Sequence, residues 1–237
     1  MIDKRVSSVE AALDGLEDGA TVMVGGFGGS GYASNLVAAL RQRGTRELTV
    51  IVNNAGTATT GVGVLVANGQ VRKVVCSFPV GRTAKQGMET FWDLYNSGRL
   101  DIEIVPQGTL AERIRVGGAG IPAFYTPTGV GTILGQSKET RTFGDRQCVL
   151  ETALVADFAL LRAAQADRLG NLVYRCAQRN FNVVMAMAAR TTVAEVYEVT
   201  ETGGLQTEAI ATPGIFVDRI VVVENDASER LGQRQTG

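Results

Sequence analysis

The hydrophobic residues of this chain fall into short continuous runs, and segments with helical spacing lie between them. In the first half, the apolar runs predict buried strands at 20–24, 48–52, 71–76 and 102–105. The helical spacing predicts helices at 35–43, 62–68, 89–96 and 110–115. Continuous apolar strands that alternate with helices are typical of a parallel sheet covered on both faces. The first half of the chain is therefore predicted to be α/β.

Two helix ends have recognisable capping residues. Ser7 and Glu10 have the spacing of a capping box, which predicts a first helix that starts at Ser7. Gly44 follows the helix predicted at 35–43 and is expected to end it, because glycine accepts the left-handed conformation of a helix C-cap.

The pattern changes near Gly117, where a long stretch with many loop-forming residues extends to Gly131. The later elements are short β-like runs at 140–143, 147–150, 158–162, 193–199 and 220–223, a turn at 167–171 and a helix at 183–189. We therefore expect an open, largely parallel sheet with helices on both faces and additional mixed or antiparallel strands in the second half. Residues 1–226 are predicted to form one domain, and the polar residues 227–237 a disordered tail.

Composition and charge exclude several classes of protein. The chain has 237 residues, 45% of them hydrophobic and 20% charged, with a net charge of −1, which is ordinary for a globular protein. The absence of Lys/Arg runs argues against nucleic acid as a partner. No apolar run reaches the length of a membrane span, and the N-terminus does not resemble a signal peptide. A cytoplasmic protein without membrane attachment is expected.

The chain contains no histidine, which is the sharpest chemical exclusion. No Ser-His-Asp or Cys-His arrangement and no His-ligated metal can form within it. The three cysteines, Cys76, Cys148 and Cys176, are far apart and form no C-x-x-C pair. They are predicted to be reduced, buried thiols, and no metal site is expected.

A glycine-rich segment, Gly25–Gly31, lies between a predicted strand and a predicted helix. Gly26, Gly28 and Gly31 satisfy the G-x-G-x-x-G pattern of dinucleotide-binding loops. A nicotinamide site, however, requires an acidic residue at the end of the second strand, where this chain has the neutral Asn53. The Tyr-x-x-x-Lys pair of short-chain dehydrogenases is also absent, so the dehydrogenase hypothesis fails.

Amide side chains follow two other predicted strands. Asn53 and Asn54 end the second strand, and Gln107 comes directly after the fourth. The carboxyl ends of strands in an open α/β sheet form the ligand crevice. Backbone N–H groups with Asn and Gln amides suit a substrate carboxylate, or the oxyanion that forms at a thioester carbonyl. Each amide could instead bond only its own backbone, as loop and cap residues often do.

Seven segments together resemble the α (A) subunit of family I coenzyme A transferases. They are Asp18 to Gly31, Asn53 to Gly56, Pro106 to Arg115, Ala123 to Gly129, Ala166 to Asn171, Arg179 to Asn182 and Thr212 to Val217. The resemblance extends in order from about residue 3 to 224. It is greatest to the 3-oxoadipate and 3-oxoacid (succinyl-CoA-dependent) branches, and the run Cys76-Ser77-Phe78-Pro79 is similar to the 3-oxoadipate branch.

The resemblance implies a two-subunit enzyme that moves coenzyme A from succinyl-CoA to 3-oxoadipate or acetoacetate. In the family, the B subunit holds a glutamate in a Ser-Glu-Asn-Gly turn, and this glutamate attacks the thioester and forms a glutamyl-CoA intermediate. The present chain has no such tetrapeptide, so it is expected to hold no catalytic residue and to act with a B subunit, as A2B2. Coenzyme A would be a substrate, and no permanently bound cofactor or metal is expected.

By the same resemblance, this chain supplies part of the acid and thioester pocket. Asn53 and Gln107 would contact a carboxylate or thioester oxygen. The neighbouring positions expected to shape the site are Asn54 and the loop residues Gly25, Gly26, Phe27, Gly28 and Gly31.

The chain departs from the family pattern at three places. Ala33 stands where the family has proline at the start of a helix, and Cys176 where it usually has lysine. The segment Val80–Met88 matches no version of the pattern and is expected to line the acid pocket. These departures leave one alternative open, a non-catalytic α/β binding or scaffold protein of the same fold.

Overall fold

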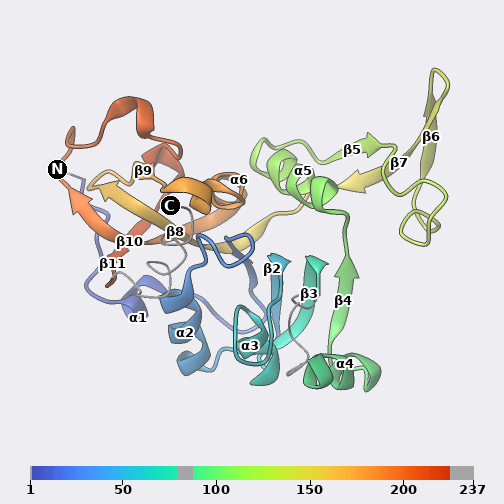
Figure 1. The fold of residues 1–237 in the computed structure, drawn as a ribbon, viewed down its shortest axis with the longest axis horizontal. Coiled ribbons are helices and arrows are strands. Elements are labelled where there is room, and N and C mark those ends of the chain that lie inside the picture. The colour runs from blue at the N-terminus through green and yellow to red at the C-terminus, as the bar shows by residue number, and fades with distance from the viewer. Residues whose placement is uncertain (1, 80–87, 225–237) are drawn as a thin grey trace, which may run out of the picture.

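The computed structural model describes residues 2–79 and 88–224 and contains a central sheet of eight strands (Figure 1). The strand order is β11-β10-β8-β1-β2-β3-β4, with the short β9 paired to β8. Every pair is parallel except β8 with β9. The strands are β1 Thr21–Val24, β2 Leu48–Asn54, β3 Val71–Phe78, β4 Asp101–Ile104, β8 Ala156–Asp167, β9 Leu172–Val173, β10 Ala189–Thr200 and β11 Arg219–Val222.

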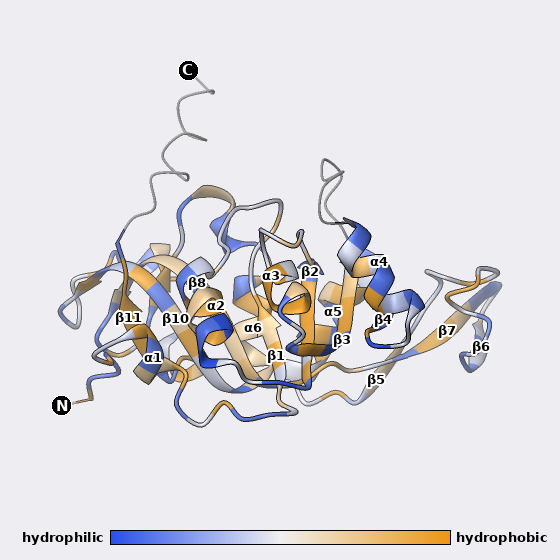
Figure 2. Ribbon diagram, turned by 90° about the horizontal axis from the view of Figure 1, so that it is seen from below, coloured by the Kyte–Doolittle hydropathy of each residue, from blue (hydrophilic) through white to orange (hydrophobic). Residues whose placement is uncertain are grey.

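Helices cover both faces of this sheet. One hydrophobic cluster joins Val22, Val50 and Val74 of the strands to Leu36 of α2. A second cluster, on the other face, joins Met23 and Ile51 to α5 and α6. The helices are α1 Val9–Ala12, α2 Ser34–Arg43, α3 Gly63–Ala67, α4 Met88–Asn96, α5 Gln107–Gly118 and α6 Asn182–Met187, with short 3-10 turns η1 Cys176–Arg179, η2 Thr207–Ala209 and η3 Gly214–Phe216. Figure 2 shows the apolar strands enclosed between these layers, so the predicted α/β fold is confirmed.

A second, antiparallel sheet projects from one side of the body (Figure 1). Its order is β5-β7-β6, from the strands β5 Ala123–Thr126, β6 Thr140–Phe143 and β7 Arg146–Thr152. We call residues 121–152 the arm. Every residue of β6 is exposed, and Ile133 in the arm is 80% exposed. The arm therefore has apolar surface that nothing in the described part of this chain covers.

A chain of ion pairs ties the base of the arm to the sheet. Arg113 of α5, with a side chain only 7% exposed, binds Glu103 at 2.6 Å and donates to the Thr152 carbonyl at 2.7 Å. Lys73 binds the other oxygen of Glu103 at 2.6 Å. Hydrogen bonds between charged groups are shorter and stronger than those between neutral groups. Glu103 is therefore placed between two cations of the body.

Stability is expected to decrease as the pH falls through the folded-state pKa of Glu103. Burial alone would raise the pKa of this carboxyl, but hydrogen bonds from Lys73 and Arg113 outweigh it and hold the pKa below its ordinary value. The stabilisation is therefore present above the unfolded pKa of about 4.3 and is lost in acid. Thermal unfolding of wild type and Glu103→Gln checks this: the midpoints should differ near neutral pH and converge in acid. A constant difference contradicts it.

The structure corrects several element ends. The residue that caps α1 is Ser8, whose hydroxyl accepts from Ala11 N at 3.1 Å, and not Ser7. Helix α5 begins at Gln107 and extends to Gly118, where a loop was expected. A Cβ on Gly117 would lie 2.1 Å from the Leu154 carbonyl oxygen, so glycine serves close packing there. Gly44 ends α2 in the left-handed conformation, as predicted.

Two expectations concern the domain organisation of the chain. The single domain 1–226 stays a prediction. The predicted tail 227–237 lies outside the described residues.

Candidate functional site

The carboxyl ends of β2, β3 and β4 lie along one edge of the sheet, beside the start of α5 (Figure 1), and β1 runs parallel to β2. Strand β1 pairs with β2 on one side and with β8 on the other, so the strand order reverses at this point. Open α/β sheets bind ligands outside the carboxyl ends of strands at such a reversal. The segments that follow β1, β2 and β4 hold the residues singled out from the sequence.

Asn53 and Gln107 meet at this edge. Gln107 Nε2 donates to Asn53 Oδ1 at 3.0 Å, although 54 positions separate the two residues in the chain. Asn53 is 2% exposed and Gln107 is partly buried. Gln107 is the first residue of α5, which directly follows β4, so its position is fixed by backbone structure. The structure therefore brings together the two amides that the sequence singled out.

Asn54 lies apart from this pair. Successive side chains of a strand point to opposite faces, so Asn54 faces away from Asn53. Its Oδ1 accepts from Gly56 N at 2.8 Å, the two-residue bond of an Asx turn. The contact that the structure gives Asn54 is therefore local: it shapes the loop after β2.

The loop Gly25–Gly31 closes as a tight turn after β1. Phe27 N donates to the Ser30 carbonyl at 3.0 Å, and Ser30 N donates back at 2.9 Å. Gly26 and Gly31 have φ of 120° and 67°, values that L-residues with side chains rarely adopt. Phe27 is 46% exposed at the tip of the turn. The loop therefore presents one aromatic ring on a backbone that only glycine permits.

Two asparagines hold this loop from the segment that includes η1 and the start of α6. Asn182, which is fully buried, donates from Nδ2 to the Gly31 carbonyl at 3.0 Å and to the Gln178 carbonyl at 2.7 Å. Asn180 Nδ2 donates to the Ser30 carbonyl at 3.0 Å. The bonds to Gly31 and Ser30 join positions about 150 residues apart, which is why sequence reasoning gave the asparagines no role beyond the family resemblance.

Gly25→Ala is expected to destabilise the chain by about 1–3 kcal/mol, as overpacking of a buried site does. A Cβ on Gly25 would lie 1.9 Å from Asn182 Oδ1. Gly108→Ala in α5 is the matched control, because a Cβ there meets nothing within 4 Å. The control should be neutral or stabilising by about 0.5–1 kcal/mol, as alanine is in a helix. Urea unfolding of both variants measures the change, and equal stabilities would contradict the packing argument.

A second loop, Gly56–Gly61, repeats this design after β2. Thr57 N donates to the Thr60 carbonyl at 3.0 Å, and Thr60 N donates back at 3.2 Å. Gly56 and Gly61 have φ of 85° and 63°, like Gly26 and Gly31 thirty residues earlier. Sequence analysis missed this loop, although the repeated spacing of two glycines five positions apart could have identified it.

The start of α2 is held by a buried ion pair. Ala33 occupies the N-cap and makes no side-chain hydrogen bond. Instead, Glu195 of β10 accepts from Leu36 N at 2.8 Å and from Arg162 Nε at 2.6 Å. Arg162 also donates to Ser34 Oγ at 2.5 Å. A carboxylate from a distant strand thus provides the capping that residue 33 does not.

Burial is the main influence on the Glu195 carboxyl, which is fully inaccessible. It raises the pKa of Glu195 above its ordinary value, and the Arg162 guanidinium and the Leu36 amide oppose that shift. Both charged groups of this pair are removed from water, so each depends on the other.

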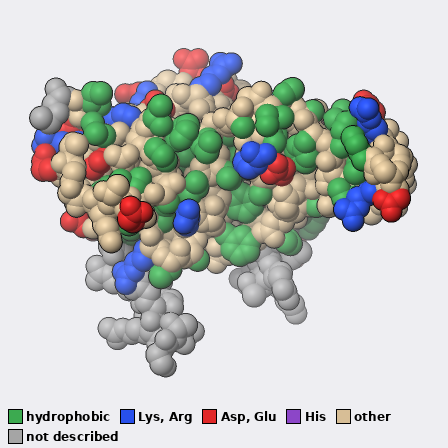
Figure 3. Space-filling view, turned by 90° about the horizontal axis from the view of Figure 1, so that it is seen from above, with side chains coloured by type: hydrophobic (Ala, Val, Ile, Leu, Met, Phe, Trp, Pro, Cys, Tyr) green, Lys and Arg blue, Asp and Glu red, His purple; other side chains and the backbone are tan. Residues whose placement is uncertain are grey.

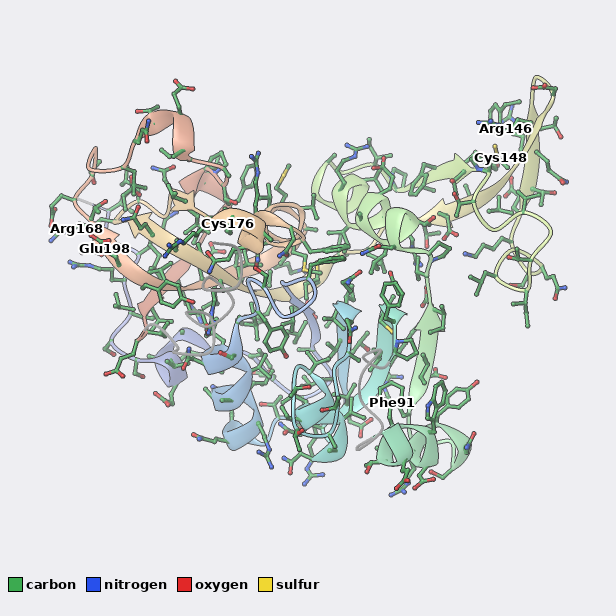
Figure 4. All side chains as sticks on the ribbon, in the orientation of Figure 1. Phe91, Arg146, Cys148, Arg168, Cys176 and Glu198 are labelled. Carbon is green, nitrogen blue, oxygen red and sulfur yellow. The ribbon has the colours of Figure 1, made fainter. Side chains whose placement is uncertain are left out.

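The three cysteines differ in burial. All three are free, with Cys76 and Cys148 buried, whereas Cys176 is exposed, so the prediction of three buried thiols is wrong at that position. Figure 4 shows Cys148 on the arm and Cys176 on the body, far from each other. Burial raises the pKa of Cys76 to about 12, which keeps this thiol protonated at neutral pH.

Three further expectations concern metal sites, membrane-spanning helices and the segment that was expected to line the acid pocket. Within residues 2–79 and 88–224, no cluster of His, Cys, Asp or Glu side chains is arranged to hold a metal ion. In the same ranges, no helix has both the length and the apolar character needed to cross a membrane. The segment expected to line the acid pocket falls mainly on residues 80–87, outside the described residues.

Comparison with known proteins covers nearly the whole chain. The family model described as Coenzyme A transferase matches residues 6–223. Among curated proteins, the chain is 49% identical to the A subunit of 3-oxoadipate CoA-transferase from Pseudomonas putida, over 98% of this chain and 99% of that protein. It is 50% identical to the A subunit of succinyl-CoA:3-ketoacid coenzyme A transferase from Xanthomonas campestris pv. campestris, over 98% of this chain and 93% of that protein.

A solved structure supports the fold independently. Glutaconate coenzyme A-transferase from Acidaminococcus fermentans superposes with a TM-score of 0.82 over 93% of this chain and 76% of that chain. The two sequences are 18% identical, so this likeness concerns the fold alone.

Proposed function

The chain belongs to the coenzyme A transferase family, and from this premise we propose that it is the A subunit of a heteromeric enzyme. The enzyme moves coenzyme A from succinyl-CoA to a 3-oxoacid, either 3-oxoadipate or acetoacetate. The names of relatives that are 49% and 50% identical to this chain give 3-oxoadipate and the 3-ketoacid class, and acetoacetate is proposed as a member of that class. Coenzyme A thioesters are substrates here, without a permanently bound cofactor, and the cytoplasm is the proposed location.

The hydrogen bond between Asn53 and Gln107 is the main observation that supports this proposal. Two amide side chains converge at the ligand-binding edge of the sheet, at 3.0 Å from each other. Each amide has N–H groups that can donate to oxygen. Such donors, when fixed in a site that excludes water, stabilise the oxyanion that develops at a thioester carbonyl or hold a carboxylate. The Gly25–Gly31 loop with Phe27 is proposed as the adjoining wall.

The nucleophile is proposed to come from a partner chain, the B subunit. Its glutamate carboxylate adds to the thioester carbonyl of succinyl-CoA, and the π electrons of that carbonyl move to its oxygen. The amides of this chain donate hydrogen bonds to the oxyanion that forms. Collapse of the oxyanion expels the CoA thiolate and leaves a succinyl-glutamyl anhydride. The thiolate then attacks the glutamyl carbonyl of the anhydride and releases succinate. The same steps in reverse, with the 3-oxoacid as acceptor, transfer CoA and restore the glutamate.

Three large hydrophobic side chains of this chain are strongly exposed. Ile133, Val155 and Ile215 are 80%, 61% and 83% exposed. Figure 3 shows hydrophobic side chains scattered over the upper face of the molecule among few charged groups. Single exposed hydrophobic residues are ordinary on a protein surface, so the partner is proposed from the relatives, which are named as A subunits. An A2B2 assembly is the proposed arrangement.

Co-expression with the protein encoded by the adjacent reading frame tests the function. The purified pair should transfer CoA from succinyl-CoA to 3-oxoadipate or acetoacetate, and this chain alone should not. Size-exclusion chromatography of the same preparation should show a complex of both chains. Transfer by this chain alone would refute the two-subunit proposal. A complex that assembles but transfers CoA to neither acid would favour the non-catalytic scaffold.

A further inference from the structure

We propose that Ser77 is a positioning residue of this site, whose hydroxyl holds the Asn53 amide when substrate displaces Gln107. The inference rests on the proposed function and gives a role to a residue that the sequence pattern did not place in the site. It depends on three observations: the register of β2 with β3, the state of the Ser77 hydroxyl, and the bond that joins Asn53 to Gln107.

Strand register places Ser77 beside Asn53. In the parallel pairing of β2 with β3, Val52 lies opposite Cys76 and Asn54 lies opposite Phe78. Asn53 is therefore opposite Ser77, one strand spacing away, which is about 4.8 Å. Since side chains at matched positions of neighbouring strands share a face, both point to the face covered by α5.

Gln107 approaches the same place from the next strand. Strand β4 pairs with β3, with Ile104 opposite Cys76, and Val105 N donates to the Cys76 carbonyl at 2.9 Å. Gln107 follows two residues later and reaches Asn53. Strands β2 and β3, and the start of α5 that follows β4, thus bring one polar side chain each to the same edge of the sheet.

The Ser77 hydroxyl is buried without a hydrogen-bond partner among the described residues. Buried polar groups are nearly always paired, and an unpaired one destabilises the state in which it occurs. A catalytic role is one of the explanations for an unpaired buried group of this kind. By strand register the neighbours of Ser77 are Asn53 on the β2 side and Val105 on the β4 side, and Asn53 is the one with a polar side chain.

An exchange of hydrogen bonds gives Ser77 that partner. In the free chain, Asn53 Oδ1 accepts from Gln107 Nε2. When a substrate oxygen accepts from Gln107 Nε2 instead, Asn53 Oδ1 loses its donor. The Ser77 O–H then donates to Asn53 Oδ1 and keeps Asn53 Nδ2 directed at the substrate. One hydrogen bond is broken within the chain and one is formed, and no covalent bond changes.

Ser77→Ala in the co-expressed complex tests this inference. We expect kcat for CoA transfer to fall about tenfold, the usual scale for loss of one hydrogen bond to a reacting-site group. The thermal midpoint should stay the same or rise, because the substitution removes an unpaired buried hydroxyl that destabilises the free state. Ser77→Thr keeps the hydroxyl and should restore kcat. Ser97→Ala, at the exposed end of α4, is the matched control and should behave as wild type.

A double-mutant cycle separates positioning from a general structural role. If Ser77 acts through Asn53, Ser77→Ala should change kcat about tenfold in wild type and less than about twofold in the Asn53→Ala background. Independent, multiplying effects would overturn the inference. A Ser77→Ala kcat within twofold of wild type, or a fall in thermal midpoint that accompanies the loss of rate, would also overturn it.

Binding without turnover distinguishes this inference from the proposed function. Calorimetric titration of the complexes with succinate and with 3-oxoadipate needs no reaction. If wild type shows no transfer, the proposed function fails. The Ser77 inference then stands only if Ser77→Ala weakens binding of one of the two acids about tenfold and Ser77→Thr restores that binding. Unchanged or absent binding overturns the inference.

Discussion

Asn53→Ala is expected to lower kcat of the assembled enzyme by a factor of about 10² to 10³, the range seen when one oxyanion donor is removed. Asn53 is 2% exposed at the carboxyl end of β2 and is held against Gln107 at 3.0 Å. The substitution removes the N–H group that would face the thioester oxygen and leaves Gln107 without its acceptor. Steady-state transfer from succinyl-CoA to 3-oxoadipate, measured on the purified complex, gives the change.

Controls for this prediction come from the same chain. Gln107→Ala should lower kcat by about tenfold or more, since its Nε2 is the other donor of the pair. Asn96→Ala, on the exposed end of α4, makes the same chemical change and should leave kcat unaltered. Size-exclusion profiles should match for all three variants. Wild-type rates in Asn53→Ala and Gln107→Ala would remove both residues from the site.

Arg162→Met is expected to lower the free energy of unfolding by about 3–5 kcal/mol, the usual result when one partner of a buried ion pair is lost. Arg162 and Glu195 are 2% and 0% exposed. Without the guanidinium, the Glu195 carboxyl stays buried and loses the hydrogen bond at 2.6 Å, and Ser34 loses its donor. The start of α2, beside the glycine loop, should loosen. Urea unfolding followed by circular dichroism measures the loss.

The double variant Arg162→Met with Glu195→Leu distinguishes lost charge pairing from lost packing. Replacing both charges with apolar groups avoids an unpaired buried charge, so the double variant should be more stable than Arg162→Met alone. It should still lose the cap that Glu195 gives to Leu36 N. A cost below about 1 kcal/mol for Arg162→Met would contradict the role given to this pair.

Local pattern was enough to predict most of the body. The apolar runs at 20–24, 48–52 and 71–76 correspond to β1, β2 and β3, because parallel strands buried on both faces have continuous hydrophobic sequence. Amides at strand ends predicted a shared site, because parallel strands end at one edge. The contact of Gln107 with Asn53 agrees with that reasoning. The periodicities therefore predicted the fold, and the position of the two amides after their strands predicted that they lie close together.

The sequence pattern did not predict the contacts between distant segments. Nothing near Gly25 indicates that its missing side chain makes room for Asn182, more than 150 positions away. In the sequence, Glu195 and Arg162 look like ordinary strand residues. Only the pairing of β8 with β10 brings them together beside the start of α2. The cap of α1 was misplaced by one residue because Ser7 and Ser8 are both good caps, and geometry alone selects Ser8. These features arise from packing between distant segments.

Intact-mass measurement of the two-chain complex after incubation with succinyl-CoA tests the central claim most directly. The account predicts a covalent CoA adduct on the partner chain and none on this chain. The adduct should disappear when 3-oxoadipate or acetoacetate is added, and it should form slowly with Asn53→Ala. An adduct on this chain, or CoA transfer by this chain without a partner, would contradict the account.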